Sequence, residues 1–514
     1  MSRVVTVPAL NEFRLELDVS QELSVRLVEG RAEVNGFELS LNKWSTLKDE
    51  LRCSIYTWTG CKLEVNGSSL VEYTSNETPL ISYLNLHLAF EQQRIRARNA
   101  HSQHAPSPEK PNERLPGYAN AVDPASSAYR VMVIGQEDSG KSTLSKTLLN
   151  YAARTGKGWT PIFVNLDPSD GGPLPPGTLS ATAYSTSTQT TSPINAFGSS
   201  STSGAALDNS AALIPQALPY AHASPARNPK VYKVLAEALA RRLDMRLERD
   251  AKARSSGVFI DTPAAFSSPN VGSDDKSSKY DLIKHALHVF NGGGFPRSMS
   301  TADNPQVDVL LVIGHEKLYI EMQRLQSSLD ASLAQKLKIL KVPKSGGAVE
   351  TDDAYRSRIQ AGQIKSFFYG SMSNLSDEQL SPQSMTIKID NLKVFKITED
   401  KVAPSSALPI GASRVLENTQ LERVNFESSS QLLTLVHSLL YLVKWPDAND
   451  VLNKHAKEFE GDLDSKDLIR ADLVGFLIVT AIDSTKRTIT VLAPSPGRLP
   501  SLNAVFGSFE WQDT

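Results

Sequence analysis

The sequence predicts an α/β protein in which a central P-loop domain with a parallel sheet lies between an N-terminal β domain and a small C-terminal α/β domain. Residues 135–143 read Gly-Gln-Glu-Asp-Ser-Gly-Lys-Ser-Thr and fit the phosphate-binding motif G-x-x-x-x-G-K-[ST]. Apolar runs of strand length alternate with helical segments after this motif, which is typical of a parallel sheet. Short runs that alternate apolar and polar residues occupy the regions on either side.

Length and composition limit the possible classes of protein. A chain of 514 residues with 40% hydrophobic residues predicts about two to four domains. The net charge of −2 gives no global attraction to nucleic acid. Cys53 and Cys61 are the two cysteines, which lack the further ligands that a zinc site needs. No run approaches the about 18 apolar residues of a membrane span, so we expect a soluble, intracellular protein.

The N-terminal region, residues 1 to about 95, predicts a β-sandwich or a compact barrel. Residues 13–17 and 23–27 alternate apolar and polar side chains, and Asn-Gly and Thr-Gly pairs separate the short strands. From residue 78 to 99 the apolar residues recur at helical spacing, which predicts a helix whose last part is rich in arginine. These arginines are expected to form a solvated face rather than to contact phosphate. Residues 99–127 contain several prolines and predict a linker, so the first domain is placed at 1–118.

The phosphate loop has the flanking elements that its chemistry requires. Residues 129–134 predict a buried strand and residues 144–155 a helix. The two glycines allow backbone N–H groups to turn toward a polyphosphate, and the start of the helix adds partial positive charge. Lys141 can reach the outer phosphates and Ser142 can offer its hydroxyl to Mg²⁺, so the sequence predicts nucleotide binding.

Three further strands are predicted in the central domain, at residues 161–167, 257–262 and 307–313, with helices near 229–250 and 279–291. Parallel strands carry ligands at their carboxyl ends, so Asp167 and Asp261 are expected at the same sheet edge as the phosphate loop. Each carboxylate can hold Mg²⁺ or accept a proton from an attacking hydroxyl. Capping of the following turn explains each aspartate equally well.

Two segments rich in small polar residues, 184–214 and 267–278, predict insertions in the central domain. The central domain is placed at 119–370 and the last domain at 371–514. In the last domain, residues 385–389 and 392–397 predict strands, and residues 475–482 and 488–492 predict a hairpin.

The order of these motifs resembles that of a known family. After Gly-Lys-Ser-Thr come Asn-Leu-Asp-Pro at 165–168, Ile-Asp-Thr-Pro at 260–263, Pro-Lys-Ser-Gly-Gly at 343–347, Phe-Phe-Tyr-Gly at 367–370 and Pro-Ser-Pro-Gly-Arg-Leu-Pro at 494–500. The set is similar to the fungal Clp-one family of mRNA cleavage and polyadenylation subunits, which is related to polynucleotide 5′-hydroxyl kinases. Residues 32–39, 56–61 and 83–87 extend the resemblance into the first domain.

The resemblance implies a three-domain build in which the N-terminal domain leans over the base of ATP. Carried over by position, Glu12 would contact the adenine and Arg52 occupies a place that is basic in the family. Asp138, Ser139, Gly140, Lys141, Ser142 and Thr143 would wrap the phosphates of ATP, and Ser142, Asp167 and Asp261 would hold Mg²⁺. The resemblance also implies a nuclear protein whose partners are cleavage factor IA components, with weak or indirect RNA contact.

Departures from the pattern of the active kinases concern the parts that serve phosphoryl transfer. Active members follow the Asp167 position with Gly-Gln, where this chain has Pro-Ser-Asp at 168–170. They also carry two lid arginines, at the positions of Gln360 and Gln363, and a tryptophan in a segment where this chain offers Phe266. Arg356 and Arg358 lie upstream and are the possible substitutes for the lid arginines.

Two functions follow from these residues. The first is an ATP-binding scaffold for 3′-end cleavage and polyadenylation without catalytic turnover, because Lys141, Ser142 and Asp167 remain while the lid arginines do not. The second is an RNA 5′-hydroxyl kinase, with Asp167 as the base and Lys141 neutralising phosphate charge. The sequence favours the scaffold. A G-protein-like switch is disfavoured because the guanine-reading Asn-Lys-x-Asp motif is missing.

Overall fold

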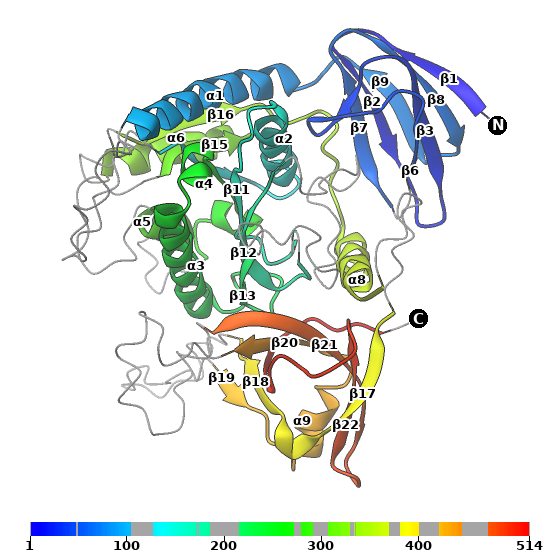
Figure 1. Cartoon of the computed structure of the whole chain (residues 1–514), viewed down its shortest axis with the longest axis vertical. Helices are drawn as coiled ribbons and strands as arrows, with labels where there is room; N and C mark the ends of the chain where they lie inside the picture. Colours follow the sequence, from blue (N-terminus) through cyan, green and yellow to red (C-terminus); the bar gives the residue numbers. More distant parts are fainter. Residues whose placement is uncertain are drawn as a thin grey trace, which may run out of the picture.

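The structure is a computed structural model that describes residues 2–47, 50–103, 127–170, 172, 174–185, 215–271, 279–290, 307–328, 334, 336–369, 381–399, 421–444 and 471–512. Figure 1 shows an N-terminal group of strands, a central sheet with helices around it, and a C-terminal sheet at the opposite end. This arrangement confirms the predicted order of a β unit, a P-loop unit and a C-terminal unit. The predicted boundaries near 118 and 370 lie outside the described residues.

The N-terminal unit consists of two facing sheets. One has the order β1 (Ser2–Val7), β8 (Cys61–Gly67), β3 (Leu23–Gly30), β6 (Trp44–Leu47). The other has the order β5 (Phe37–Glu38), β4 (Glu33–Val34), β7 (Arg52–Thr57), β2 (Asn11–Glu16), β9 (Val71–Ser75). Alternating apolar side chains such as Phe13, Leu15, Leu23 and Val25 point inward and form one shared core.

Helix α1 (Leu80–Gln103) packs on the central sheet, where Tyr83 and Phe90 share a core with Val131 and Phe259. The prediction of a solvated arginine face is wrong for Arg94, which is 2% exposed. Its guanidinium donates to the Ser256 carbonyl at 2.9 Å and pairs with Glu91 at 3.2 Å. A buried guanidinium needs such partners because desolvation of an unpaired charge is costly.

The central sheet has the order β13 (Gln216–Pro219), β12 (Thr178–Ala183), β11 (Ile162–Asn165), β14 (Val258–Asp261), β10 (Arg130–Gly135), β15 (Val307–Ile313), β16 (Lys338–Val342). Strands β11, β14, β10, β15 and β16 are mutually parallel, while β12 and β13 extend the sheet in antiparallel register. The predicted parallel sheet is therefore confirmed, with an antiparallel edge in addition.

Helices cover both faces of this sheet. Helix α2 (Lys141–Arg154) joins α1 on the face of Val131 and Val133. On the face of Met132 and Ile134 lie α3 (Pro229–Arg249), α5 (Asp281–His288) and α6 (Glu316–Ser328), while α4 (Ala251–Ser256) connects α3 to β14. Helix α8 (Asp353–Tyr369) lies between the N-terminal strands and the C-terminal sheet (Figure 1). Successive strand residues face opposite sides, so an uninterrupted apolar strand is buried on both faces.

The C-terminal sheet has the order β17 (Gln383–Lys388), β22 (Thr488–Ala493), β21 (Asp472–Asp483), β20 (Leu439–Lys444), β23 (Asn503–Phe506), β18 (Lys393–Ile397), β19 (Leu421–Arg423). The predicted hairpin is β21 with β22. Among the described residues, α9 (Ser429–Leu433) is the α-helix of this unit.

Contacts along α8 and the antiparallel edge dock the C-terminal sheet on the central unit. The Tyr441 hydroxyl donates to the Pro176 carbonyl at 2.7 Å, and the rings of Phe367 and Phe476 lie 4.9 Å apart. The predicted insertions fall outside the described residues over 186–214 and 272–278, as does the predicted linker over 104–126. No helix in the described part of the chain has the length and apolar character to cross a membrane.

Candidate nucleotide-binding site

The phosphate loop connects β10 to α2 at the carboxyl edge of the parallel sheet. Gly140 is the residue before the helix and has φ +89°, a conformation that favours glycine. An ideal Cβ at Gly140 would meet nothing within 4 Å, so the loop faces open space at this point. Asp138 also has a positive φ, 52°. The loop thus has the left-handed turns that direct successive N–H groups toward an anion.

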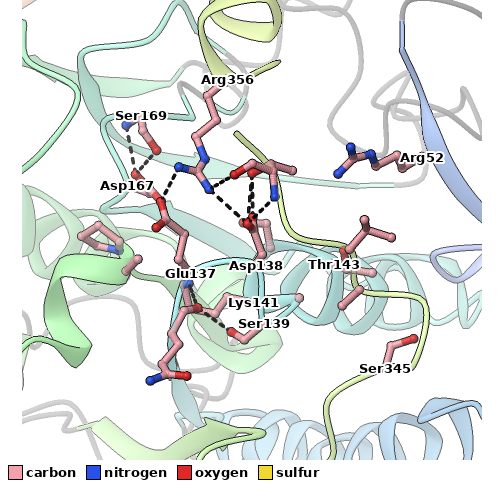
Figure 2. A pocket seen from close by; sticks show the side chains of 18 of the residues that line it. Arg52, Glu137, Asp138, Ser139, Lys141, Thr143, Asp167, Ser169, Ser345 and Arg356 are labelled. Atoms are coloured by element: carbon pink, nitrogen blue, oxygen red, sulfur yellow. Dashed lines mark hydrogen bonds and ion pairs between the residues drawn. The ribbon is translucent and has the colours of Figure 1, made fainter. Parts of the chain in front are cut away.

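Lys141 and Ser139 lie at the same point of the loop. The Lys141 ammonium donates to the Gln136 carbonyl at 2.8 Å, and the Ser139 hydroxyl donates to the same carbonyl at 2.8 Å. Lys141 is 8% exposed, so its charge lies inside the site (Figure 2). A buried ammonium beside a glycine-rich loop is suited to binding the outer phosphates of a nucleotide.

The two aspartates predicted at this edge are indeed brought together with Ser142. Strands β11 and β14 pair so that Asn165 is level with Asp261. Burial raises the pKa of Asp261 to about 7, against a hydrogen bond from Ser142 that lowers it. Asp167 accepts hydrogen bonds from the Ser169 N–H at 2.9 Å and its hydroxyl at 2.6 Å, and burial raises its pKa.

This donor set fits Mg²⁺ held jointly by protein and phosphate. Within the described ranges, no group of three or more His, Cys, Asp or Glu side chains could hold a metal unaided. Mg²⁺ is commonly bound through one or two carboxylates, a P-loop hydroxyl and phosphate oxygens. Ser142, Asp167 and Asp261 would supply the protein part of such a set.

A cavity of about 1220 Å³ opens over the loop. Eight of the predicted site residues line it: Arg52, Asp138, Ser139, Gly140, Lys141, Ser142, Thr143 and Asp167. Glu12 is 1% exposed and lies behind this surface, because its carboxylate accepts from the Arg14 guanidinium at 2.6 Å. Arg14, rather than Glu12, lines the cavity.

Arg14 is a site residue that the sequence analysis missed. Its guanidinium donates to the Tyr73 hydroxyl at 3.1 Å and to the Glu77 carbonyl. A Cβ added to Gly347 would lie 2.8 Å from Arg14 Nε, so the 343–347 segment can approach only because it lacks a side chain there. The alternation of residues 13–17 gave no sign of a site at Arg14, whose side chain lines the cavity.

The N-terminal unit docks on α2 through the turn between β4 and β5. Gly36 has φ +78°, and an added Cβ would lie 2.9 Å from the Thr147 carbonyl of α2. The Asn150 side chain donates to the Asn35 carbonyl at 2.8 Å, and the Tyr151 hydroxyl donates to Glu33. The helix that begins at the phosphate loop is thereby joined to the N-terminal unit, whose Asn35 lines the cavity.

Helix α8 contacts the phosphate loop from the other side (Figure 2). Arg356 pairs with Glu137 at 2.9 Å and with Asp138 at 3.0 Å. Arg358 makes a bidentate contact with Glu50 of the N-terminal unit, at 2.8 and 2.7 Å. Both arginines that could substitute for lid arginines are therefore bound to carboxylates.

Gln360 and Gln363 contact the segment that replaces Gly-Gln. The Gln360 amide donates to the Ser169 carbonyl at 3.1 Å, and the Gln363 amide donates to Asp170 at 3.0 Å. The two departures noted in the sequence are thus neighbours in space. Gln363 neutralises no charge on Asp170, which an arginine at that position would do.

The far half of the cavity is formed by residues 223–227 and by parts of 263–271. Among the described lining residues, five are basic, and each contacts an acid or a carbonyl: Arg14, Arg52, Lys141, Arg227 and Arg356. Arg227 pairs with Glu399 at 2.9 Å. The described wall therefore carries no excess of basic side chains to track a polynucleotide backbone.

Family models match three parts of the chain. An N-terminal beta-sandwich domain of polyadenylation factor matches residues 6–97, an mRNA cleavage and polyadenylation factor CLP1 P-loop matches residues 135–370, and a pre-mRNA cleavage complex II protein Clp1 matches residues 380–513. The last two models together include the phosphate loop, α8 and the C-terminal sheet.

Relatives and solved structures match over nearly the whole length. An mRNA cleavage and polyadenylation factor CLP1 of Laccaria bicolor is 37% identical over 99% of this chain and 97% of its own. Protein CLP1 homolog of Arabidopsis thaliana is 32% identical over 98% of this chain and 93% of its own. The Clp1p chain of a wild-type Clp1p–Pcf11p complex has a TM-score of 0.73 at 21% identity, with 100% and 99% of the two chains covered, and so shares the fold.

Proposed function

We propose a function from the premise that this chain belongs to the Clp1 family of mRNA cleavage and polyadenylation factors. The chain would be an ATP-binding scaffold subunit of the nuclear complex that cleaves and polyadenylates pre-mRNA. Its partners would be other subunits of that complex, cleavage factor IA components among them. A Pcf11-like protein is one candidate, since a relative of the same fold was solved with Pcf11p. Bound ATP and Mg²⁺ would be structural ligands rather than reactants.

The observation that carries this proposal is the state of the basic residues around an intact phosphate loop. Lys141 remains buried at the loop, which supports nucleotide binding. Phosphoryl transfer also needs cations on the γ-phosphate oxygens, and their loss costs on the order of a thousandfold or more in rate. Arg356 and Arg358 are held by carboxylates, and Gln360 and Gln363 are neutral dipoles.

A nucleotide in this cavity would join the N-terminal and central units. Arg14, Arg52 and Asn35 line one end of the cavity and come from the N-terminal unit, whereas the phosphate loop lines the other part. A ligand that binds the closed arrangement stabilises it by mass action, with about 2.7 kcal/mol at a hundredfold excess over Kd. ATP would thus maintain the surface that partner subunits recognise.

The alternative function is an ATP-dependent RNA 5′-hydroxyl kinase. Asp167 lines the cavity near Lys141 and could accept a proton, and the far half of the cavity leaves space for an acceptor. The buried Asp167 already accepts two bonds from Ser169, and the described lining offers few cations for RNA. These features favour the scaffold and an indirect or weak contact with RNA.

One experiment on the purified full chain separates the two functions. Acid release and chromatography identify the bound nucleotide, and γ-labelled ATP with a 5′-hydroxyl RNA tests for transfer. Intact stoichiometric ATP without labelled RNA supports the scaffold. Labelled RNA that disappears in Lys141→Ala would overturn it in favour of the kinase.

A second measurement tests the structural role of ATP. Lys141→Ala combined with Thr143→Ala should reduce both nucleotide retention and co-purification with a Pcf11-like partner. Co-purification that persists with an empty site would show that ATP has no such role.

A further inference from the structure

We propose that the outer face of helix α1 is a docking surface for an acidic amphipathic helix of a partner protein. The apolar part of this face, here called the α1 stripe, consists of Ile81, Leu84, Leu88 and Ile95. Within the described ranges, Tyr83 is the one α1 residue that lines the nucleotide cavity, and it belongs to another, buried face of the helix. The α1 stripe is therefore separate from the nucleotide site, and its role is independent of nucleotide binding.

Helix α1 carries apolar side chains on two different faces. The inner face, with Tyr83 and Phe90, packs on the central sheet. The members of the α1 stripe recur at helical spacing and so form a second row. Ile81 is 49% exposed and Leu88 is 50% exposed. A surface helix normally presents polar side chains on the face away from the core, so a second apolar row indicates a binding partner.

The α1 stripe is largely open to solvent in the described structure. Leu84 and Ile95 are half-buried, yet neither belongs to a hydrophobic core of the described residues. Figure 1 shows α1 along the outside of the molecule, with α2 and the central sheet on one side of it. From Ile81 to Ile95 the row is about 21 Å long, or about four helical turns. Rows of this kind are the ridges against which a second helix packs.

The exposed charges of α1 are of one sign. Glu91 is the one acidic residue of the helix. It is 7% exposed and pairs with Arg94 and Lys157. Arg96 and Arg98 are exposed on the same helix, and no acid of the described chain pairs with Arg96. The open face of α1 is therefore both apolar and positively charged.

The charge of Arg96 indicates the chemistry of the partner. Cations stabilise a helix mainly in its last turn, whereas Arg96 lies about two turns before the end of α1 at Gln103. A partner helix with acidic residues beside its apolar row would pair with Arg96 while it covers Leu88. A second copy of this chain lacks that complementarity through the same face, because the one acid of α1 is buried.

The test measures binding of two fluorescent peptides to the full chain by anisotropy. Both are synthetic helical peptides of about five turns with leucines in a row at helical spacing. Glutamates flank the row in one peptide and lysines flank it in the other. The glutamate peptide should bind at least about tenfold more tightly, because the lysine peptide brings like charges to Arg96.

Two substitutions separate the apolar and the charged part of the surface. Leu88→Asp should weaken the glutamate peptide by about tenfold or more, because it removes apolar area and adds a carboxylate to the interface. Arg96→Glu should weaken the glutamate peptide and strengthen the lysine peptide, which is the signature of a direct charge contact. Ile81→Asp takes the place of Leu88→Asp if that variant folds poorly.

Matched control variants change the same residue types on other elements. Leu433→Asp is on α9, where Leu433 is 75% exposed. Arg324→Glu is on α6, where Arg324 pairs with Glu321 at 2.8 Å. Both controls should bind the glutamate peptide as the wild type does. Retention of ATP should be equal in all these variants, so a loss of docking is distinguished from a loss of nucleotide binding.

A second measurement uses the chain purified together with its partner subunits. Leu88 is replaced by the photoreactive p-benzoylphenylalanine, and the cross-linked segment is identified by mass spectrometry. A partner segment with an apolar row at helical spacing and flanking acids is the expected product. A cross-link within the chain itself would overturn the proposal, because the α1 stripe would already be covered.

Binding of the glutamate peptide that Leu88→Asp weakens and Arg96→Glu reverses supports the docking surface. Absence of binding to the wild type, or equal binding to the wild type and both variants, overturns it. Single-stranded RNA that binds instead of the peptide, and that Arg96→Glu but not Leu88→Asp releases, overturns it in favour of nucleic acid. Dimers in sedimentation that Leu88→Asp dissociates overturn it in favour of a second copy.

Discussion

Substitution of Gly36 by alanine tests whether docking of the N-terminal unit on α2 forms the nucleotide site. Gly36 has φ +78°, which costs a residue with a Cβ about 1 kcal/mol. The new Cβ would lie 2.9 Å from the Thr147 carbonyl and 3.1 Å from the Tyr151 ring, so the turn must move away from the helix. Such overpacking costs about 1 kcal/mol or more, and the weakened Asn150 bond to Asn35 costs about 1 kcal/mol.

Gly156→Ala provides the matched control. Gly156 follows α2 and has φ +74°, yet an added Cβ would meet nothing within 4 Å. Gly156→Ala should therefore lose only the stability that the unfavourable backbone conformation costs, with no steric clash. The free-energy cost of Gly36→Ala should exceed that of Gly156→Ala by about 2 kcal/mol, which is the part due to the docking contact. This difference corresponds to about a 30-fold shift in the docking equilibrium.

Hydrogen exchange of the full chain is the suitable assay, because it reports local opening of one segment. Gly36→Ala should increase exchange across residues 33–39 by about 30-fold relative to Gly156→Ala, and it should weaken ATP binding because Asn35 lines the cavity. Identical exchange in the two variants would refute the reasoning. Increased exchange with unchanged ATP affinity would show that docking and nucleotide binding are independent.

Three further outcomes are expected. Because burial raises the pKa of Asp261 to about 7 and Mg²⁺ binds the ionised form, Mg²⁺-dependent ATP affinity measured by calorimetry should be constant above this pH. Below this pH the affinity should fall about tenfold per pH unit, because Asp261 becomes protonated. A pH dependence that persists in Asp261→Asn would show that another group causes it. Tyr441→Phe leaves the buried Pro176 carbonyl unpaired and should lower stability to urea by about 1–2 kcal/mol, whereas an unchanged transition would assign the docking to apolar contacts. Arg94→Met should cost about 3 kcal/mol in thermal unfolding, and a neutral result would mean that Glu91 is satisfied by its other partners.

The sequence predicted the parts of the site whose partners are close along the chain. The phosphate loop, its strand and its helix form one continuous segment, so local pattern and glycine positions define them. Asp167 and Asp261 were placed at one edge by a general rule of parallel sheets, and the pairing of β11 with β14 agrees with that placement.

Residues whose environment depends on distant segments were not predictable in this way. In the sequence, Arg94 looks like part of the solvated end of a helix. In the structure, its guanidinium donates to the carbonyl of the distant Ser256. Arg14 alternates like a surface residue, but its partners Tyr73 and Glu77 come from beyond the next strands. Arg356 was considered as a phosphate ligand because nothing local in the sequence indicates that Glu137 and Asp138 engage it. Burial of a cation is decided by such long-range partners.

The strand order of the central sheet has a consequence for how the protein is made on the ribosome. Strand β10 leads into the phosphate loop, but its neighbours are β14 and β15, which end at Asp261 and Ile313. The N-terminal strands find their partners within the first stretch of chain, up to Ser75. A nascent chain that ends before Val258 would therefore carry a folded first unit beside an apolar β10 that has neither of its partners, which is a site for aggregation. The cavity is lined by residues as late in the chain as Gln360, so a nucleotide would find its complete site only late in synthesis.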